Sequence, residues 1–215
     1  MKGARRGHIS IGFDRSRTME GFAEDIGLYG VTHPDVTFSV DRMERDEVQP
    51  QLANYRIDLA GVIQPEAYPN LSTLAVAPLD IKAVVHPSHP LAEFNSVTFN
   101  DLLPHPLVLP PIGSLRDLLD AAARRQDFEL RPILECELPF AGHILEHAGA
   151  VGFSANTATR QETGLSGMVS VPISRRDVST PNLHLVQLRG RALSVAASRF
   201  ADRIVQRFAQ YAGEV

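Results

Sequence analysis

Two guanidinium groups and two hydroxyl groups lie close together in the polar segment Asp14-Arg15-Ser16-Arg17-Thr18. Guanidinium groups bind carboxylates and phosphates through paired N–H donors. Alternating apolar residues before this segment indicate a strand, and apolar residues spaced by three or four after it indicate a helix. The backbone N–H groups at the start of such a helix also favour an anion. The segment therefore predicts one wall of a small-molecule site, built from Arg15, Ser16, Arg17 and Thr18.

The first 63 residues alternate between strand and helix patterns. Strands are predicted at 9–13, 36–40 and 56–63, and helices at 19–29 and near 44–54, where Pro50 fits the first turn or a kink. The third strand is apolar nearly throughout, which is typical of a parallel sheet buried on both faces. This order predicts a βαβαβ arrangement, one half of a doubly wound α/β fold.

A second half of the same kind is predicted beyond two extended runs, 71–79 and 80–85, which Pro78 separates and which suit a crossing between two lobes. Further strands are predicted at 107–109, 133–137, 151–154, 168–173 and 183–188. Further helices are predicted at 98–103, with Thr98 as its cap, at 115–125, at 139–148, and at 194–211, with an apolar stripe from Ala197 to Phe208. The helix at 139–148 is expected to turn inward its residues Phe140, Ile144, Leu145 and Ala148, and to have Gly149 as its C′ residue.

Composition excludes several classes of protein. The net charge of −4 leaves no basic field to hold nucleic acid. The single cysteine, Cys136, cannot form a disulfide within the chain and is interpreted as a small buried strand residue. No apolar run approaches the roughly 20 residues of a membrane helix, and the basic N-terminus lacks the apolar stretch of a signal peptide. We therefore predict a cytoplasmic protein with no membrane contact.

Other chemistry receives little support from the residues. His86 and His89 form an HxxH pattern, but the neighbouring prolines keep that segment extended. His143 and His147 are spaced for one face of a helix, with Glu146 between them, and are interpreted as part of its polar surface rather than as metal ligands. Two segments, 152–156 and 164–168, miss the G-x-S-x-G pattern of serine hydrolases. The sequence thus predicts no metal, no cofactor and no catalytic residue.

Several segments, taken in order, resemble the effector-binding domain of LysR-type transcriptional regulators. The resemblance covers nearly all of residues 7–212. The segments that carry it are HISIGF at 8–13, RIDLA at 56–60, the stretch from Leu79 to Leu91 with HPLA at 89–92, AGAVGF at 148–153, GMV before VPI at 167–173, and LSVAASRF at 193–200.

The resemblance implies an α/β, type-2 periplasmic-binding-protein-like fold. In this fold two doubly wound lobes are joined by two crossing strands, and an effector binds in the cleft between the lobes. Lobe I is expected at 7–79 plus 188–215, and lobe II at 80–187. The family also implies a homodimer, and a tetramer for the full-length regulator. Its N-terminal winged helix-turn-helix domain is missing before the first strand, so DNA binding is expected only through that absent domain.

The same resemblance places further residues in the effector site, namely Arg45, Ile63, Gln64, Pro110, Ile112, Ser114 and Phe140. Arg45 departs from the family, which often has a small or hydroxyl residue near this position. Arg17 and Arg45 can together hold a carboxylate or phosphate, or they can be solvated charges that pair with nearby acids. Ser16 and Ser114 can instead be helix N-caps, which does not exclude a ligand contact.

The leading hypothesis is a ligand-sensing regulatory domain, not an enzyme, that binds a small anionic effector. An aromatic or short aliphatic carboxylate is the favoured class. A free-standing solute-binding protein of a transport system is the alternative, and the lack of a signal peptide argues against it. An enzyme on the same fold is the third hypothesis, without a catalytic constellation to support it. A fold analogy alone does not decide among these functions.

Overall fold

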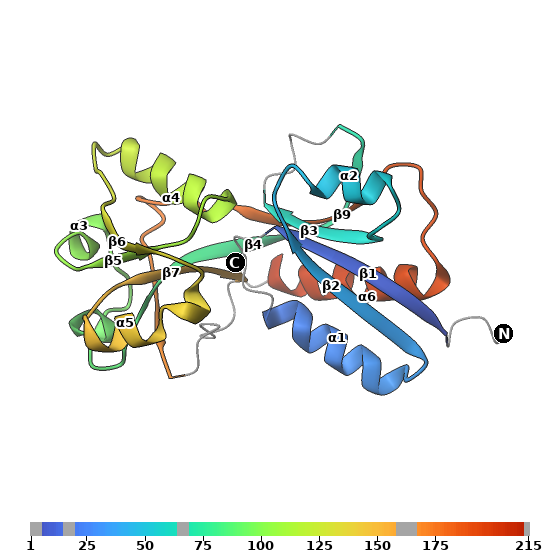
Figure 1. Ribbon diagram of the computed structural model, residues 1–215, viewed down its shortest axis with the longest axis horizontal. Helices are drawn as coiled ribbons and strands as arrows, with labels where there is room; N and C mark the ends of the chain where they lie inside the picture. Colours follow the sequence, from blue (N-terminus) through green and yellow to red (C-terminus); the bar gives the residue numbers. More distant parts are fainter. Residues whose placement is uncertain (1–5, 15–19, 64–68, 158–166, 213–215) are drawn as a thin grey trace. The chain divides into compact units, whose positions relative to one another are not determined.

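The computed structural model describes residues 6–14, 20–63, 69–157 and 167–212 (Figure 1). The chain separates into two compact units. The first unit comprises the described residues up to Pro78 together with those from Pro181 onward, and the second unit spans Leu79–Thr180. The chain thus returns to the first unit at Thr180/Pro181, earlier than the 187/188 boundary expected from the sequence.

The first unit contains a mixed sheet with a parallel core. Strand β1 (Gly7–Asp14) pairs in parallel with β2 (Val36–Met43) and with β3 (Leu59–Ile63). Strand β9 (Asn182–Leu188) runs antiparallel to both β3 and β4 (Leu71–Val85), which gives the order β2-β1-β3-β9-β4. The predicted βαβαβ arrangement of the first 63 residues is therefore confirmed.

Helices cover both faces of this sheet: α1 (Glu20–Thr32) and α6 (Val195–Ala212) lie on one face and α2 (Val48–Ala53) on the other (Figure 1). The alternation in β1 explains this, because Ile9, Ile11 and Phe13 are fully buried and the Phe13 ring meets the Phe22 ring of α1 edge-on. On the opposite face Val48 and Leu52 of α2 are fully buried. Pro50 occupies the first turn of α2, one of the two predicted placements.

The spacing of Met19, Phe22, Ala23, Ile26 and Tyr29 predicts the apolar side of helix α1, and the structure differs from it at two positions. Ala23 is exposed, whereas Asp25 is only 4% exposed. Asp25 is buried because it pairs with two arginines of α6, at 3.3 Å from Nε of Arg203 and 2.7 Å from Nη1 of Arg207. The buried Asp25 carboxylate is therefore stabilised by charged partners that lie far away in the sequence.

Strand β4 is continuous over 15 residues and is not broken at Pro78, contrary to the prediction of two separate runs. Pro78 pairs with Asn182 at the last position of the β4–β9 ladder, and Leu79 begins the ladder with β7 (Gly152–Thr157). Proline has no N–H to donate, and it is tolerated here because it lies where the strand changes partner. The two extended runs are therefore one strand that serves both units.

In the second unit, β4 lies antiparallel to β7 and to β8 (Val169–Pro172). Strands β5 (Leu107–Leu109) and β6 (Pro132–Glu135) form a parallel pair, and a parallel bridge joins Leu107 to Val151 beside the start of β7. The second half is thus doubly wound only in part, because its β4, β7 and β8 ladders are antiparallel.

The helices of the second unit are short. They comprise η2 (Pro90–Glu93), α3 (Phe99–Leu102), α4 (Ser114–Arg124), η3 (Leu138–Phe140) and α5 (Gly142–His147). Thr98 caps α3 as predicted, through a capping box with Asp101. The N-cap of α4, however, is Gly113 and not Ser114, because the backbone there has φ 154°, which favours glycine.

The predicted helix at 139–148 is divided into η3 and α5. Phe140 at the end of η3 is 77% exposed and Ala148 is exposed, so both are wrongly predicted to face inward. Leu138 and Leu145 supply the buried contacts instead. Gly149 has φ 55° and follows α5 as the predicted C′ residue. Among the described helices, none combines the length and apolar character needed to cross a membrane.

Candidate functional site

The structure describes only part of the predicted site. Arg15, Ser16, Arg17, Thr18 and Gln64 lie outside the described residues. In the first unit, Arg45 is half-buried in the segment between β2 and α2, and Ile63 at the end of β3 is buried in the sheet. Their assignment to an effector site stays a prediction.

In the second unit, the predicted residues Pro110, Ile112 and Ser114 lie in one connection, from β5 to α4. Ile112 is 81% exposed, whereas Ser114 is buried as the first residue of α4. Phe140 follows the neighbouring strand β6. Because β5 and β6 are parallel, the segments that follow them leave at the same end of the pair, which is where α/β proteins place ligands.

Arg116 of α4 holds this end of the β5–β6 pair together. Its Nη1 atom lies 2.8 Å from Oε1 of Glu135 at the end of β6 and donates to the Pro110 carbonyl at 3.3 Å. Its Nε atom donates to Asp120 one turn along α4. Most of the Arg116 side chain is buried, so these contacts fix the β5–α4 connection to the strand beside it.

A second group of polar side chains lies on one face of the β4–β7 ladder. Asp80 is directly opposite Asn156, and Lys82 is directly opposite Ser154. Residues opposite each other in an antiparallel pair project to the same face, so these four form one cluster, the Lys82 cluster. Lys82, Ser154 and Asn156 are 5%, 2% and 8% exposed.

The electrostatics of the Lys82 cluster are unusual for a sheet interior. Burial lowers the pKa of Lys82 because its ammonium group loses hydration, and the Asp80 carboxylate opposes this by raising the pKa. Asp80 also pairs with Arg175, 3.3 Å away. The hydroxyl of Ser154 is buried and has no hydrogen-bond partner among the described residues. A desolvated cation beside an unsatisfied hydroxyl is typical of a binding site rather than of a structural core.

The sequence prediction did not include the Lys82 cluster. Alternation in the run from Asp80 to Val85 places Asp80 and Lys82 on one face of the strand. Because both residues are charged, the sequence pattern predicts that this face is exposed to solvent. Ser154 and Asn156 lie on the same face because of the pairing register between β4 and β7, which are some 70 residues apart in the chain. The alternation pattern of a single strand does not reveal this register.

The sequence matches the LysR substrate binding domain over residues 2–209. The chain belongs to this family. The match confirms the resemblance to LysR-type regulators that the sequence predicts, and the domains of this family are regulatory. No curated protein matches the sequence.

Three solved structures show how widely this LysR domain shares its fold. HinK, a LysR family transcriptional regulator from Pseudomonas aeruginosa, is 18% identical, with a TM-score of 0.74 over 94% of this chain and 72% of that chain. The effector-binding domain of QuiR in complex with shikimate is 19% identical, with a TM-score of 0.73 over 95% of this chain and 98% of that chain. The Synechocystis PCC6803 CcmR regulatory domain in complex with 2-PG is 17% identical, with a TM-score of 0.72 over 94% and 98%. These similarities confirm the predicted type-2 periplasmic-binding-protein-like fold.

In this LysR domain the HxxH pattern has separate structural roles for its two histidines. His86 Nδ1 lies 2.7 Å from the Ser88 hydroxyl, whereas His89 is buried and caps η2 by accepting a hydrogen bond from the Leu91 N–H at 3.1 Å. Because Nδ1 of His89 is the acceptor, the neutral ring carries its proton on Nε2. Burial lowers the pKa of His89, and the neighbouring His105 ring, 4.5 Å away between centroids, lowers it further.

We expect the free energy of unfolding to decrease as the pH falls below the usual histidine pKa of 6.5, and His89 to be one cause. Unfolded His89 takes up a proton near that pH, whereas folded His89 does so only at lower pH, so protons favour the unfolded state in between. His89→Asn keeps a side-chain acceptor for the Leu91 N–H but does not titrate. Urea unfolding at pH 7.5 and 5.5 should show a smaller loss of stability for this variant than for the unmodified chain, and equal losses would contradict the assignment.

Proposed function

We propose that this LysR domain is the ligand-sensing part of a transcriptional regulator and that its effector is a small anion of the carboxylate class. The single observation that supports the anion is the Lys82 cluster, where a buried ammonium group lies opposite a buried hydroxyl with no hydrogen-bond partner among the described residues. We further propose that the effector binds between the two lobes, as the family resemblance implies, and that Arg17 and Arg45 contribute to its binding.

The chemistry of the Lys82 cluster suits an anion with several acceptor atoms. The Lys82 ammonium, the Ser154 hydroxyl and the Asn156 amide all have N–H or O–H groups that can donate to a carboxylate. Hydrogen bonds to charged groups contribute about 1.5–3 kcal/mol each, so a carboxylate beside Lys82 gains more from such a bond than a neutral ligand does. The cluster therefore favours the charged form of a ligand over a neutral analogue.

Sensing in this proposal is a shift between two conformations of the regulator. An effector changes the output only to the extent that it binds one conformation more tightly than the other. By the family resemblance, the regulator is a dimer in the cytoplasm and contacts DNA through a winged helix-turn-helix domain. The domain described here then has a regulatory role and catalyses no reaction.

The test is a thermal-shift screen of this chain against small carboxylates, phosphates, amino acids and sugars. A ligand at 100 times its Kd stabilises the folded state by about 2.7 kcal/mol, and we expect this from a carboxylate. The shift should diminish in Arg17→Ala and in Arg45→Ala but persist in Arg131→Ala, which removes an exposed arginine that pairs with exposed Glu129. Equal stabilisation by a neutral sugar in all three variants would contradict an anionic effector.

A further inference from the structure

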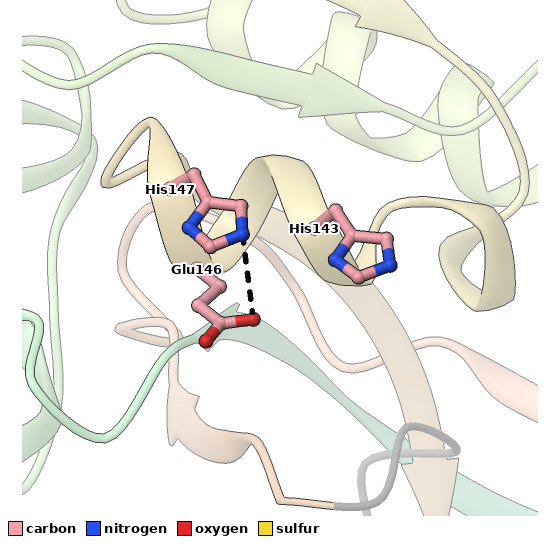
Figure 2. Close-up of side chains that lie close together, drawn as sticks. All are labelled: His143, Glu146 and His147. Atoms are coloured by element: carbon pink, nitrogen blue, oxygen red, sulfur yellow. Dashed lines mark ion pairs between the residues drawn. The ribbon is translucent and has the colours of Figure 1, made fainter.

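Helix α5 carries three metal-binding side chains on its exposed surface. Figure 2 shows His143, Glu146 and His147 projecting from the same side of the helix. One ligand atom from each residue lies within 4.8 Å of the other two, and the histidine rings are parallel within 6° with centroids 5.8 Å apart. Within the part of the chain that the structure describes, no other three histidine, cysteine or acidic side chains come this close.

We propose that His143, Glu146 and His147 bind a divalent transition-metal ion, with Zn²⁺ as the representative. Residues four apart on a helix are neighbours on its surface, so two imidazoles at this spacing can ligate one ion at about 2.0–2.1 Å each. Glu146 adds a carboxylate oxygen from the same turn, and its Oε2 already lies 3.9 Å from Nε2 of His147. Two nitrogens and one oxygen suit zinc and its transition-metal neighbours, whereas Mg²⁺ and Ca²⁺ prefer oxygen ligands alone.

The backbone of α5 is held in place for this role. Leu145, on the inner side of the helix, is fully buried and packs with Val84, Val108 and Leu138. The three ligands are exposed, so their side chains can rotate onto the ion without disturbing that packing. Three protein ligands leave the fourth tetrahedral position to water, which is the geometry of an open site rather than of a closed structural one.

The sequence alone does not indicate this site. The spacing of His143 and His147 predicts a polar helix surface, with Glu146 between them in the chain. The structure adds that a ligand atom of Glu146 lies within 4.8 Å of one from each histidine. The three side chains therefore form a set of ligands and not only a polar face.

The test is isothermal titration of the metal-free chain with ZnCl₂ at pH 7.5. We expect one binding event that weakens at least about tenfold in His143→Gln and in His147→Gln, since each change removes an imidazole ligand. His8→Gln, which changes an exposed histidine of the first unit, should bind as the unmodified chain does. Circular dichroism establishes that each variant is folded.

Two further measurements distinguish this site from other binding. Excess Mg²⁺ should leave Zn²⁺ binding unchanged. Co²⁺ in place of Zn²⁺ should give visible absorption bands that are lost in the doubly substituted His143→Gln/His147→Gln chain. Undiminished Zn²⁺ binding by that double variant, no Zn²⁺ binding by the unmodified chain, or equal displacement by Mg²⁺ would each overturn the proposal.

Discussion

Replacing Asp58 with alanine is expected to lower the free energy of unfolding by about 3 kcal/mol, because it breaks a largely buried ion pair. The Asp58 carboxylate accepts a hydrogen bond from Nη2 of Arg191 at 2.6 Å and another from the Ser10 N–H of β1 at 3.0 Å. The two charged side chains are only 13% and 15% exposed. Without Asp58, the guanidinium would stay buried with the Ile57 carbonyl, 2.7 Å away, and the Tyr55 ring as its described contacts.

Chemical denaturation of matched variants measures this effect. Glu129→Ala removes the acid of an exposed ion pair with Arg131 and should change stability by less than about 0.5 kcal/mol, since exposed pairs contribute little. Asp58→Asn keeps the shape and one acceptor, so its loss should fall between the two. If Asp58→Ala were no more destabilising than Glu129→Ala, the Asp58–Arg191 ion pair would not stabilise the fold as expected.

Replacing Lys82 with methionine is expected to weaken effector binding by roughly 10- to 100-fold, which corresponds to one lost hydrogen bond between charged groups. The same substitution removes the desolvation cost of a buried ammonium and also its attraction to Asp80, which keeps Arg175 as a partner, so the change in the free energy of unfolding should be small. A large loss of affinity together with a small change in stability is a combination that a purely structural lysine would not produce.

Calorimetric titration with the best carboxylate from the screen, alongside urea unfolding, gives both quantities. Ser154→Ala removes the buried hydroxyl and should weaken binding several-fold without a loss of stability. Arg131→Ala is the control for the removal of a cation from the surface. Full affinity in Lys82→Met would exclude the Lys82 cluster from the effector site, even if the chain still bound a carboxylate through its arginines.

Much of this fold follows from periodicity and turn chemistry. The alternation of Ile9, Ile11 and Phe13 identifies β1, and the stripe from Ala197 to Phe208 identifies the buried side of α6. Thr98 and Gly149 are predicted from local capping rules, and both rules depend only on neighbouring residues. Elements of this kind can be predicted because the residues that determine them lie within one short segment of the sequence.

The remaining features depend on partners that a single segment does not reveal. Asp25 is buried because of Arg203, which lies 178 positions away in the chain. Phe140 is exposed because η3 ends there and α5 begins anew at Gly142, so the predicted periodicity does not run through it. The Lys82 cluster requires the β4–β7 register. The sequence therefore predicts the scaffold better than the polar groups on which a site depends.

The position of β9 affects the order in which the chain can assemble. This strand lies between β3 and β4 in the sheet of the first unit, yet it belongs to the last fifth of the sequence. During synthesis β3 leaves the ribosome long before its neighbour β9 exists, and all of Leu79–Thr180 is complete before β9 emerges. Until then β3 and the first half of β4 each keep an unpaired edge. The nascent chain can therefore misassemble at these two edges until β9 is synthesised and pairs with both of them.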